Sequence, residues 1–226
     1  MDIHKPKPWH GLREFLKEYA IIVVGVLTAL AAEQTVEFIH VQTQVREARE
    51  ALRDEISRDA TFAEEAVEEN RCIDAWFGKL TAWAKGGSRP DLKGTTTMLA
   101  IYPTTVWDVV KTGAVSHMPL KDQLAYAQFY FQLQNENGIA QHQRDDGQKI
   151  SSYQAQESLT PDQARGLLET IAYARPLVHA TQMNGAHLVE MASGLGAGPT
   201  PMPNWMVRQL TAFCAVAGAA PRTTQR

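Results

Sequence analysis

Two cysteines, Cys72 and Cys214, are the residues of this chain with the clearest chemistry. They lie far apart and form no Cys-x-x-Cys pair, which argues against a structural zinc site. Each belongs to a segment with amphipathic helical spacing, so a bridge between them would fasten the C-terminal helix to a long N-terminal helix. Cysteine pairs in an oxidising compartment are usually bridged, and we expect a disulfide here. Two buried free thiols are the alternative.

Four residues of metal-binding types recur every four positions along one predicted helix face: His179, Met183, His187 and Met191. Imidazole and thioether groups are ligands for copper and zinc, so a metal site is one interpretation. Ligands eight residues apart lie about 12 Å apart along a helix axis, however, so this spacing alone does not assemble a site. The favoured interpretation is a methionine-containing packing stripe with the two histidines at its rim, and we expect no metal.

His142, Asp145 and Asp146 form the most polar patch of the chain. A helical sensor domain can bind a small polar ligand through such a patch, but a solvated helix face is the favoured interpretation. The paired carboxylates at 64–65 and 68–69 are likewise expected on an exposed helix face. The chain has no glycine-rich phosphate loop, no nucleophile elbow and no His-Glu-x-x-His motif. We therefore expect no catalytic residues and no cofactor.

An uncharged apolar run at 19–32 lies between a basic flank and a long charged stretch. The flank holds four cationic side chains, Lys5, Lys7, Arg13 and Lys17. A helix of that length rises only about 20 Å against a hydrocarbon core of about 30 Å, so a span must also use the apolar residues on both sides. We predict a cytoplasmic flank at 1–18 and a transmembrane anchor at 19–40. A cleaved signal peptide and a buried or interfacial helix are the alternatives.

The distribution of cations around the anchor predicts its orientation. The first Lys or Arg after the apolar run is Arg46. The positive-inside rule then places the N-terminus in the cytoplasm and the body outside it, which in a bacterium means the inner membrane and the periplasm. Membrane lipid is therefore an expected partner. Gly25, Ala29 and Ala32 share one helix face, and small residues at this spacing let two membrane helices approach closely. The alternative is that small residues are common in spans.

Beyond the anchor, apolar residues recur at helical spacing across 41–83. The stripe becomes denser towards Trp76 and Phe77, which we expect to be core residues. The part nearest the anchor is therefore predicted to be a stalk, and the later part a helix packed in a bundle. A break near 69–70 is left open, and the glycines at 86–87 predict a turn.

The middle of the chain predicts two further elements. Short helices are expected within 95–113, with Gly113 in a left-handed turn after the last of them. Pro119 is placed to start a second long helix. Its polar part at 134–148 is predicted as either a solvated helix or a hinge.

The last third of the chain begins with a strong helix signal. Thr160 is followed by proline and, three positions on, by glutamine, which is typical of an N-cap with a capping box. The helix that it starts is predicted to kink at Pro176. A linker rich in glycine and proline at 194–203 precedes a C-terminal helix and tail at 204–226. Because no segment alternates with period two, the predicted fold is all-α, with stalk and helical bundle at 41–193.

The order of these features resembles an uncharacterised family of bacterial single-anchor membrane proteins. The elements that carry the resemblance are the apolar stretch at 24–30, the charged helix around 52–56, a Trp-Asp-x-x-Lys-x-Gly motif at 107–113 and an aromatic stretch at 124–130. The resemblance implies a membrane anchor with a helical extracytoplasmic body, and it implies no activity. Within the motif, Trp107 is expected to be a core anchor and Lys111 to lie at a helix C-terminus, where a cation is favourable.

Composition narrows the function classes. The net charge is −3, and no basic stripe outside the N-terminal flank and no nucleic-acid motif is present, so nucleic acid is not an expected partner. The long stalk and the small-residue anchor face favour a non-enzymatic scaffold that forms a homo-oligomer or joins a larger membrane complex. The alternative is a periplasmic ligand-binding or sensory module that signals through a partner.

Overall fold

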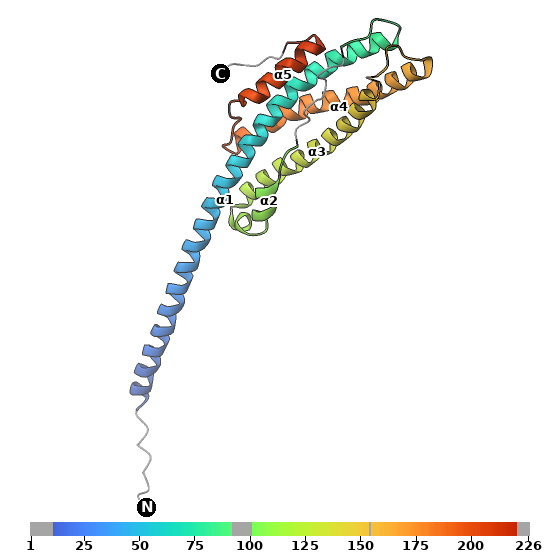
Figure 1. The fold of residues 1–226 in the computed structure, drawn as a ribbon. Coiled ribbons are helices and arrows are strands. Elements are labelled where there is room, and N and C mark those ends of the chain that lie inside the picture. The colour runs from blue at the N-terminus through green and yellow to red at the C-terminus, as the bar shows by residue number, and fades with distance from the viewer. Residues whose placement is uncertain (1–10, 92–100, 154, 221–226) are drawn as a thin grey trace, which may run out of the picture. The chain divides into compact units, whose positions relative to one another are not determined.

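The computed structural model describes residues 11–91, 101–153 and 155–220. Every regular element within these ranges is a helix, which confirms the all-α prediction (Figure 1). The chain divides into two compact units, one up to Glu47 and one from Ala48 on. The long helix α1, Leu12–Ala84, contributes to both units and has no break near residues 69–70.

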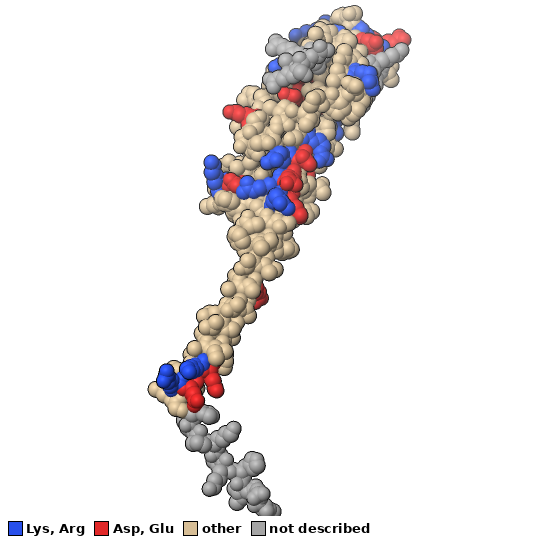
Figure 2. Space-filling model, turned by 90° about the vertical axis from the view of Figure 1, so that its left-hand side faces the viewer, with Lys and Arg blue, Asp and Glu red and all other residues tan. Residues whose placement is uncertain are grey.

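The first unit consists, in its described part, of the N-terminal portion of α1. Arg13, Glu14, Lys17 and Glu18 lie close to its start, and the apolar run continues from there without a charged side chain until Glu33. Figure 2 shows the charged side chains at this end and the uncharged surface beyond them. The apolar side chains are exposed, for example Ile21 at 72% and Leu27 at 59%.

In the second unit α1 is a central helix. Its residues from Ala48 on contact four different parts of the chain. The disulfide from Cys72 reaches α5, Asn204–Ala217. The Asn70 amide oxygen accepts a hydrogen bond from Gln143 on α3, Leu120–Ser151. The Thr61 hydroxyl bonds to Thr200 in the linker before α5. The fourth contact is with α4, described below.

The hydrophobic core lies where α1 meets α4 and α5. Trp76 and Phe77 are both buried in it, with ring centroids 6.0 Å apart. Its other members are Cys72, Ile73, Leu80 and Trp83 on α1, Ile150 on α3, Leu167, Ile171, Ala174 and Val178 on α4, and Leu210, Phe213, Cys214 and Ala217 on α5.

The segment after α1 turns through Gly86, whose φ of +90° favours glycine, as the paired glycines predict. The short helix α2, Thr105–Val110, and the 3-10 helix η1, Ala114–His117, come next. The predicted left-handed conformation of Gly113 is wrong, because its φ is −106°. The chain continues directly into η1 there, so no left-handed residue is needed to end α2. The part of the predicted 95–113 region before residue 101 lies outside the described residues.

Helices α3 and α4 pack along each other in the bundle (Figure 1). Pro119 is the N-cap of α3, and the polar stretch at 134–148 is helical, not a hinge. Helix α4, Pro161–Gly194, begins with the predicted capping box on Thr160 and contains Pro176. It approaches α1 closely at Gly185, where an added Cβ would lie 2.7 Å from the Val67 side chain.

Candidate functional site

The small residues of the predicted anchor face, Gly25, Ala29 and Ala32, are exposed on α1. A Cβ built on Gly25 would meet no atom within 4 Å. By length and composition α1 can cross a membrane: a window of 18 residues has a mean hydropathy of 1.8, and none of that window is buried. In the described chain, therefore, this face is available but the structure brings nothing to it.

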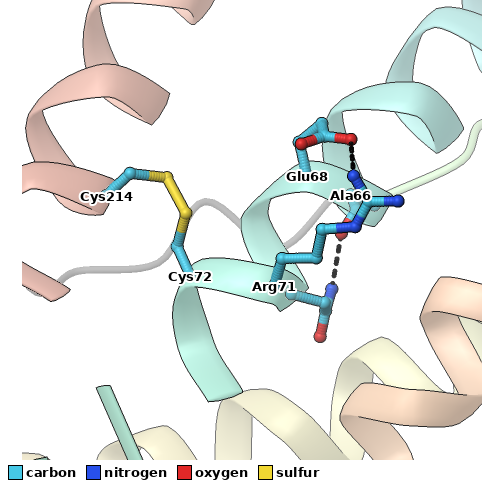
Figure 3. Close-up of a disulfide and its surroundings, with 6 residues drawn as sticks. Ala66, Glu68, Arg71, Cys72 and Cys214 are labelled. Carbon is cyan, nitrogen blue, oxygen red and sulfur yellow. Dashed lines mark hydrogen bonds and ion pairs between the residues drawn. A yellow bond between two sulfur atoms is a disulfide. The ribbon is translucent and has the colours of Figure 1, made fainter. Parts of the chain in front are cut away.

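The two cysteines are joined by a disulfide. Cys72 on α1 and Cys214 on α5 have Cα atoms 5.1 Å apart, and both side chains are fully buried. Figure 3 shows the bridge linking the two helices, with the nearby Arg71 turned instead to Glu68 on its own helix. The bridge thus fastens α5 to the central helix.

The predicted core aromatic residues occupy two different places. Trp76 and Phe77 belong to the hydrophobic core. Trp107, on α2, is only half-buried, and no residue of α2 is fully buried. Its indole stacks on the buried ring of Tyr130 at a centroid distance of 4.8 Å and an interplanar angle of 8°. Trp107 therefore covers the core from its edge.

The interpretation of the histidine and methionine series on α4 as a packing stripe is wrong. His179 and His187 are exposed, and Met183 is 72% exposed. The buried positions of α4 lie on another face, which carries Leu167, Ile171, Ala174, Val178, Thr181, Gly185, Leu188 and Ala192. Helix α4 contacts α1 and α3 through that second face, so the histidine and methionine side chains face away from the bundle.

The polar patch on α3 is divided between two faces. His142 and Asp145 are exposed, as expected of a solvated face. Asp146 is buried with Gln143, and its carboxylate pairs with Lys149 at 3.0 Å. The patch is therefore not one site, and its inward part belongs to a cluster that the sequence patterns did not reveal.

This cluster is a set of buried carboxyl groups, here called the acid layer: Glu55, Asp59, Glu65 and Glu69 on α1 and Glu136 on α3. The expectation that Glu65 and Glu69 lie on an exposed face is wrong, since each is only 4% exposed. The reason is that α1 is surrounded by neighbours over these turns and has no fully solvated face there. A signal was present in the sequence, because Glu55, Asp59 and Glu69 are spaced like the apolar stripe at Leu52, Ile56 and Ile73.

Glu55 is the best-satisfied member of the acid layer. Its carboxylate accepts the backbone N–H of Val106 at 2.9 Å and of Trp107 at 3.3 Å, and the hydroxyl of Tyr130 at 2.7 Å. These two N–H groups lie in the first turn of α2 and have no acceptor within that helix. Because Thr104, the N-cap residue, makes no side-chain capping bond, Glu55 supplies the cap from another helix.

Asp59 lies one turn further along α1 and has no such partners. It is 1% exposed, and neither carboxyl oxygen has a hydrogen-bond partner within the described chain. Burial, followed by the charge of Glu55, raises the pKa of Asp59 to about 8. Burial likewise raises the pKa of Glu65 to about 7. Both groups therefore hold much of their proton at neutral pH.

Tyr102 enters the acid layer from the segment before α2. Its backbone is held by the Asn137 side chain, which accepts the Tyr102 N–H and donates to the Tyr102 carbonyl, each at 2.9 Å. The side chain is 3% exposed, and its hydroxyl has no partner among the described residues. Burial raises the pKa of this hydroxyl, and the charges of Glu136, Glu65, Asp59 and Glu69 raise it further.

A small cavity of about 10 Å³ lies beside Tyr102, which is room for about one water molecule. Besides Tyr102, its lining comes from three helices: Ala66, Glu69 and Asn70 on α1, Glu136, Ala140 and Gln143 on α3, and Thr181 on α4. Glu136 also accepts a hydrogen bond from Asn184 on α4. Burial is the main cause that raises the pKa of the Glu136 carboxyl group. Most of this lining is polar, which is unusual for the inside of a helical bundle.

The acid layer can hold protons and accept hydrogen bonds, but it contains no nucleophile paired with a base. Within the described residues, no three His, Cys, Asp or Glu side chains converge as metal ligands. Comparison with known proteins adds nothing further, since no protein-family model, no curated protein and no solved structure matches the chain.

Proposed function

We propose that this chain is a single-span membrane protein whose helical body lies outside the cytoplasm and assembles with a second copy or with another membrane protein. The observation that carries the proposal is the exposed apolar part of α1, of which no residue in the most apolar window is buried. Exposed apolar surface of this extent is unfavourable in water and needs a cover of lipid or protein.

Two further features support the location. The Cys72–Cys214 disulfide is typical of an oxidising compartment and rare in the cytosol. The Lys and Arg residues gather before the apolar run, and the next cation is Arg46, so the positive-inside rule favours a cytoplasmic N-terminus. Both features favour a bacterial inner-membrane protein with a periplasmic body, in line with the family that the sequence resembles.

A reporter fusion tests the location. Alkaline phosphatase, which is active only after export, is fused after residue 226, and green fluorescent protein is fused at the same position in a second strain. We expect phosphatase activity without fluorescence. Fluorescence without phosphatase activity would place the body in the cytoplasm and overturn the proposal.

A pair of substitutions tests assembly through the anchor. Ala29 lies on the face of small residues, whereas Leu27 lies on roughly the opposite face of the helix at 100° per residue. Ala29→Ile should weaken in-membrane crosslinking, because a branched side chain prevents close approach of two helices. Leu27→Ile is the matched control and should leave crosslinking unchanged. Equal crosslinking in both variants would exclude assembly through this face.

A second function, as a sensory module, is favoured by the acid layer. Carboxyl groups that are buried around an unpartnered tyrosine hydroxyl respond to protons or cations in the surrounding compartment. The response would pass to a partner through α1, which runs from the acid layer to the anchor. A body whose stability did not change between pH 5 and pH 8 would remove this candidate.

A further inference from the structure

The cavity beside Tyr102 is rich in hydrogen-bond acceptors because the donors around it are bound elsewhere. The Gln143 amide nitrogen donates to the Asn70 amide oxygen at 2.9 Å and to the Thr181 hydroxyl at 3.4 Å. The Asn70 amide nitrogen donates to the Ala66 carbonyl at 2.8 Å. These bonds turn the amide nitrogens to protein oxygens, and an amide has no further donors of other kinds.

The Tyr102 hydroxyl is the second observation. It lies among carboxyl groups, of which Glu136 exerts the largest charge effect on it, yet it reaches none of them within hydrogen-bond distance. A buried hydroxyl without a partner costs about 1–3 kcal/mol, so native proteins rarely retain one. A polar group that lines a cavity of this size is normally bridged to its neighbours by one intervening atom.

The charge of the lining decides between candidates for that atom. Glu69 and Glu136 both line the cavity, and no Lys, Arg or His is found among the described lining residues. A neutral water would complete the hydrogen bonds and leave the negative charge uncompensated. A cation would do both, and the donor set of carboxylate, amide and hydroxyl oxygens is the one that hard cations prefer.

We propose that this cavity is a binding site for one calcium ion, with the carboxylates of Glu69 and Glu136 as charged ligands and the oxygens of Tyr102, Gln143 and Thr181 as neutral ones. Calcium fits better than magnesium because it accepts irregular sets of six to eight oxygens, whereas magnesium retains several waters for which this cavity has no room. The ion would tie the segment that carries Tyr102 to three helices at once.

The affinity depends on the number of charges. Only two carboxylates line the cavity, consistent with the absence of a convergent set of three within the described chain. Sites with few charged ligands bind calcium with dissociation constants of about 0.1–1 mM, as extracellular modules do. This inference does not depend on where the body of the protein lies, so its failure would leave the proposed function standing.

The test is thermal unfolding of the full-length protein in detergent micelles, at neutral pH and fixed ionic strength. Protein freed of metals with EDTA is titrated with calcium chloride, and magnesium chloride serves as the contrast. Calcium should raise the melting temperature by a few degrees with saturation near its dissociation constant, and magnesium should have a much smaller effect. Absence of a calcium effect at about 10 mM, well above that dissociation constant, would overturn the proposal.

Three variants assign the effect to the cavity. Glu136→Gln should abolish the calcium response, whereas Asp145→Asn, which removes the same charge from the exposed face of α3, should retain it. Tyr102→Phe should weaken calcium binding about tenfold while the metal-free protein keeps or gains stability, because an unpartnered hydroxyl is removed. It also serves as the test if Glu136→Gln does not fold. An unchanged calcium response in both cavity variants would show surface binding, and stabilisation by acid alone would show that protons fill the role; either result contradicts the proposal.

Discussion

Replacement of Asp59 by asparagine measures the free-energy cost of keeping a proton on a buried carboxyl group. Asparagine has the shape of a protonated aspartic acid and cannot ionise. In the native protein the pKa of Asp59 is raised from 3.8 to about 8, mainly by burial. The folded state therefore binds a proton that the unfolded state has released over this whole interval.

Linkage gives the sign of the effect. Because the unfolded state binds fewer protons than the native state, the free energy of unfolding falls as the pH rises. The contribution of Asp59 is fully present below pH 3.8 and is lost as the pH rises through the folded pKa of about 8. The loss is about 1.4 kcal/mol for each pH unit in this interval, which amounts to about 4 kcal/mol at pH 7.

We therefore expect Asp59→Asn to stabilise the body by up to about 4 kcal/mol at pH 7 and to change little near pH 4. Urea unfolding monitored by circular dichroism in detergent, at several pH values, measures both numbers. The matched control is Asp54→Asn, which removes an exposed carboxylate from the same helix and should leave the pH dependence unchanged. An Asp59→Asn variant that is no more stable than the wild type at pH 7 and keeps its pH slope would refute this reasoning.

Three further substitutions test other contacts of the body. Glu55→Gln should lower the free energy of unfolding by about 1–3 kcal/mol, since it weakens the cap of α2 and the bond to Tyr130; tryptophan fluorescence should report the loosened edge. Gly185→Ala should destabilise by about 1–3 kcal/mol, because its methyl group would lie 2.7 Å from Val67, and an unchanged melting temperature would show that α4 can move away. Cys214→Ser should cost up to about 5 kcal/mol by removing a bridge that closes a long loop, and dithiothreitol should have no further effect on that variant.

Local signals in the sequence predicted local structure well. Thr160 could be assigned as an N-cap because its partners lie within three residues, and the capping box forms. The disulfide could be predicted from two cysteines on amphipathic helices and an oxidising compartment. The prediction for Gly113 was wrong because the backbone conformation after a helix depends on the next element, and here η1 begins at once.

The acid layer could not be predicted because its burial depends on partners distant in the sequence. Glu64 and Glu65 are adjacent carboxylates, and only the positions of α3 and α4 decide that Glu65 is the buried one. Tyr102 has no periodic pattern around it and enters the layer because Asn137, on another helix, holds its backbone. The cavity is therefore a property of the assembled bundle that no segment encodes alone.

Native mass spectrometry of the full-length protein, gently extracted from its own membrane, tests the proposed anchoring and assembly together. We predict integer multiples of 25.1 kDa, or a larger complex that contains this chain. A monomer without a partner, recovered from the soluble fraction, would contradict both the anchor and the assembly.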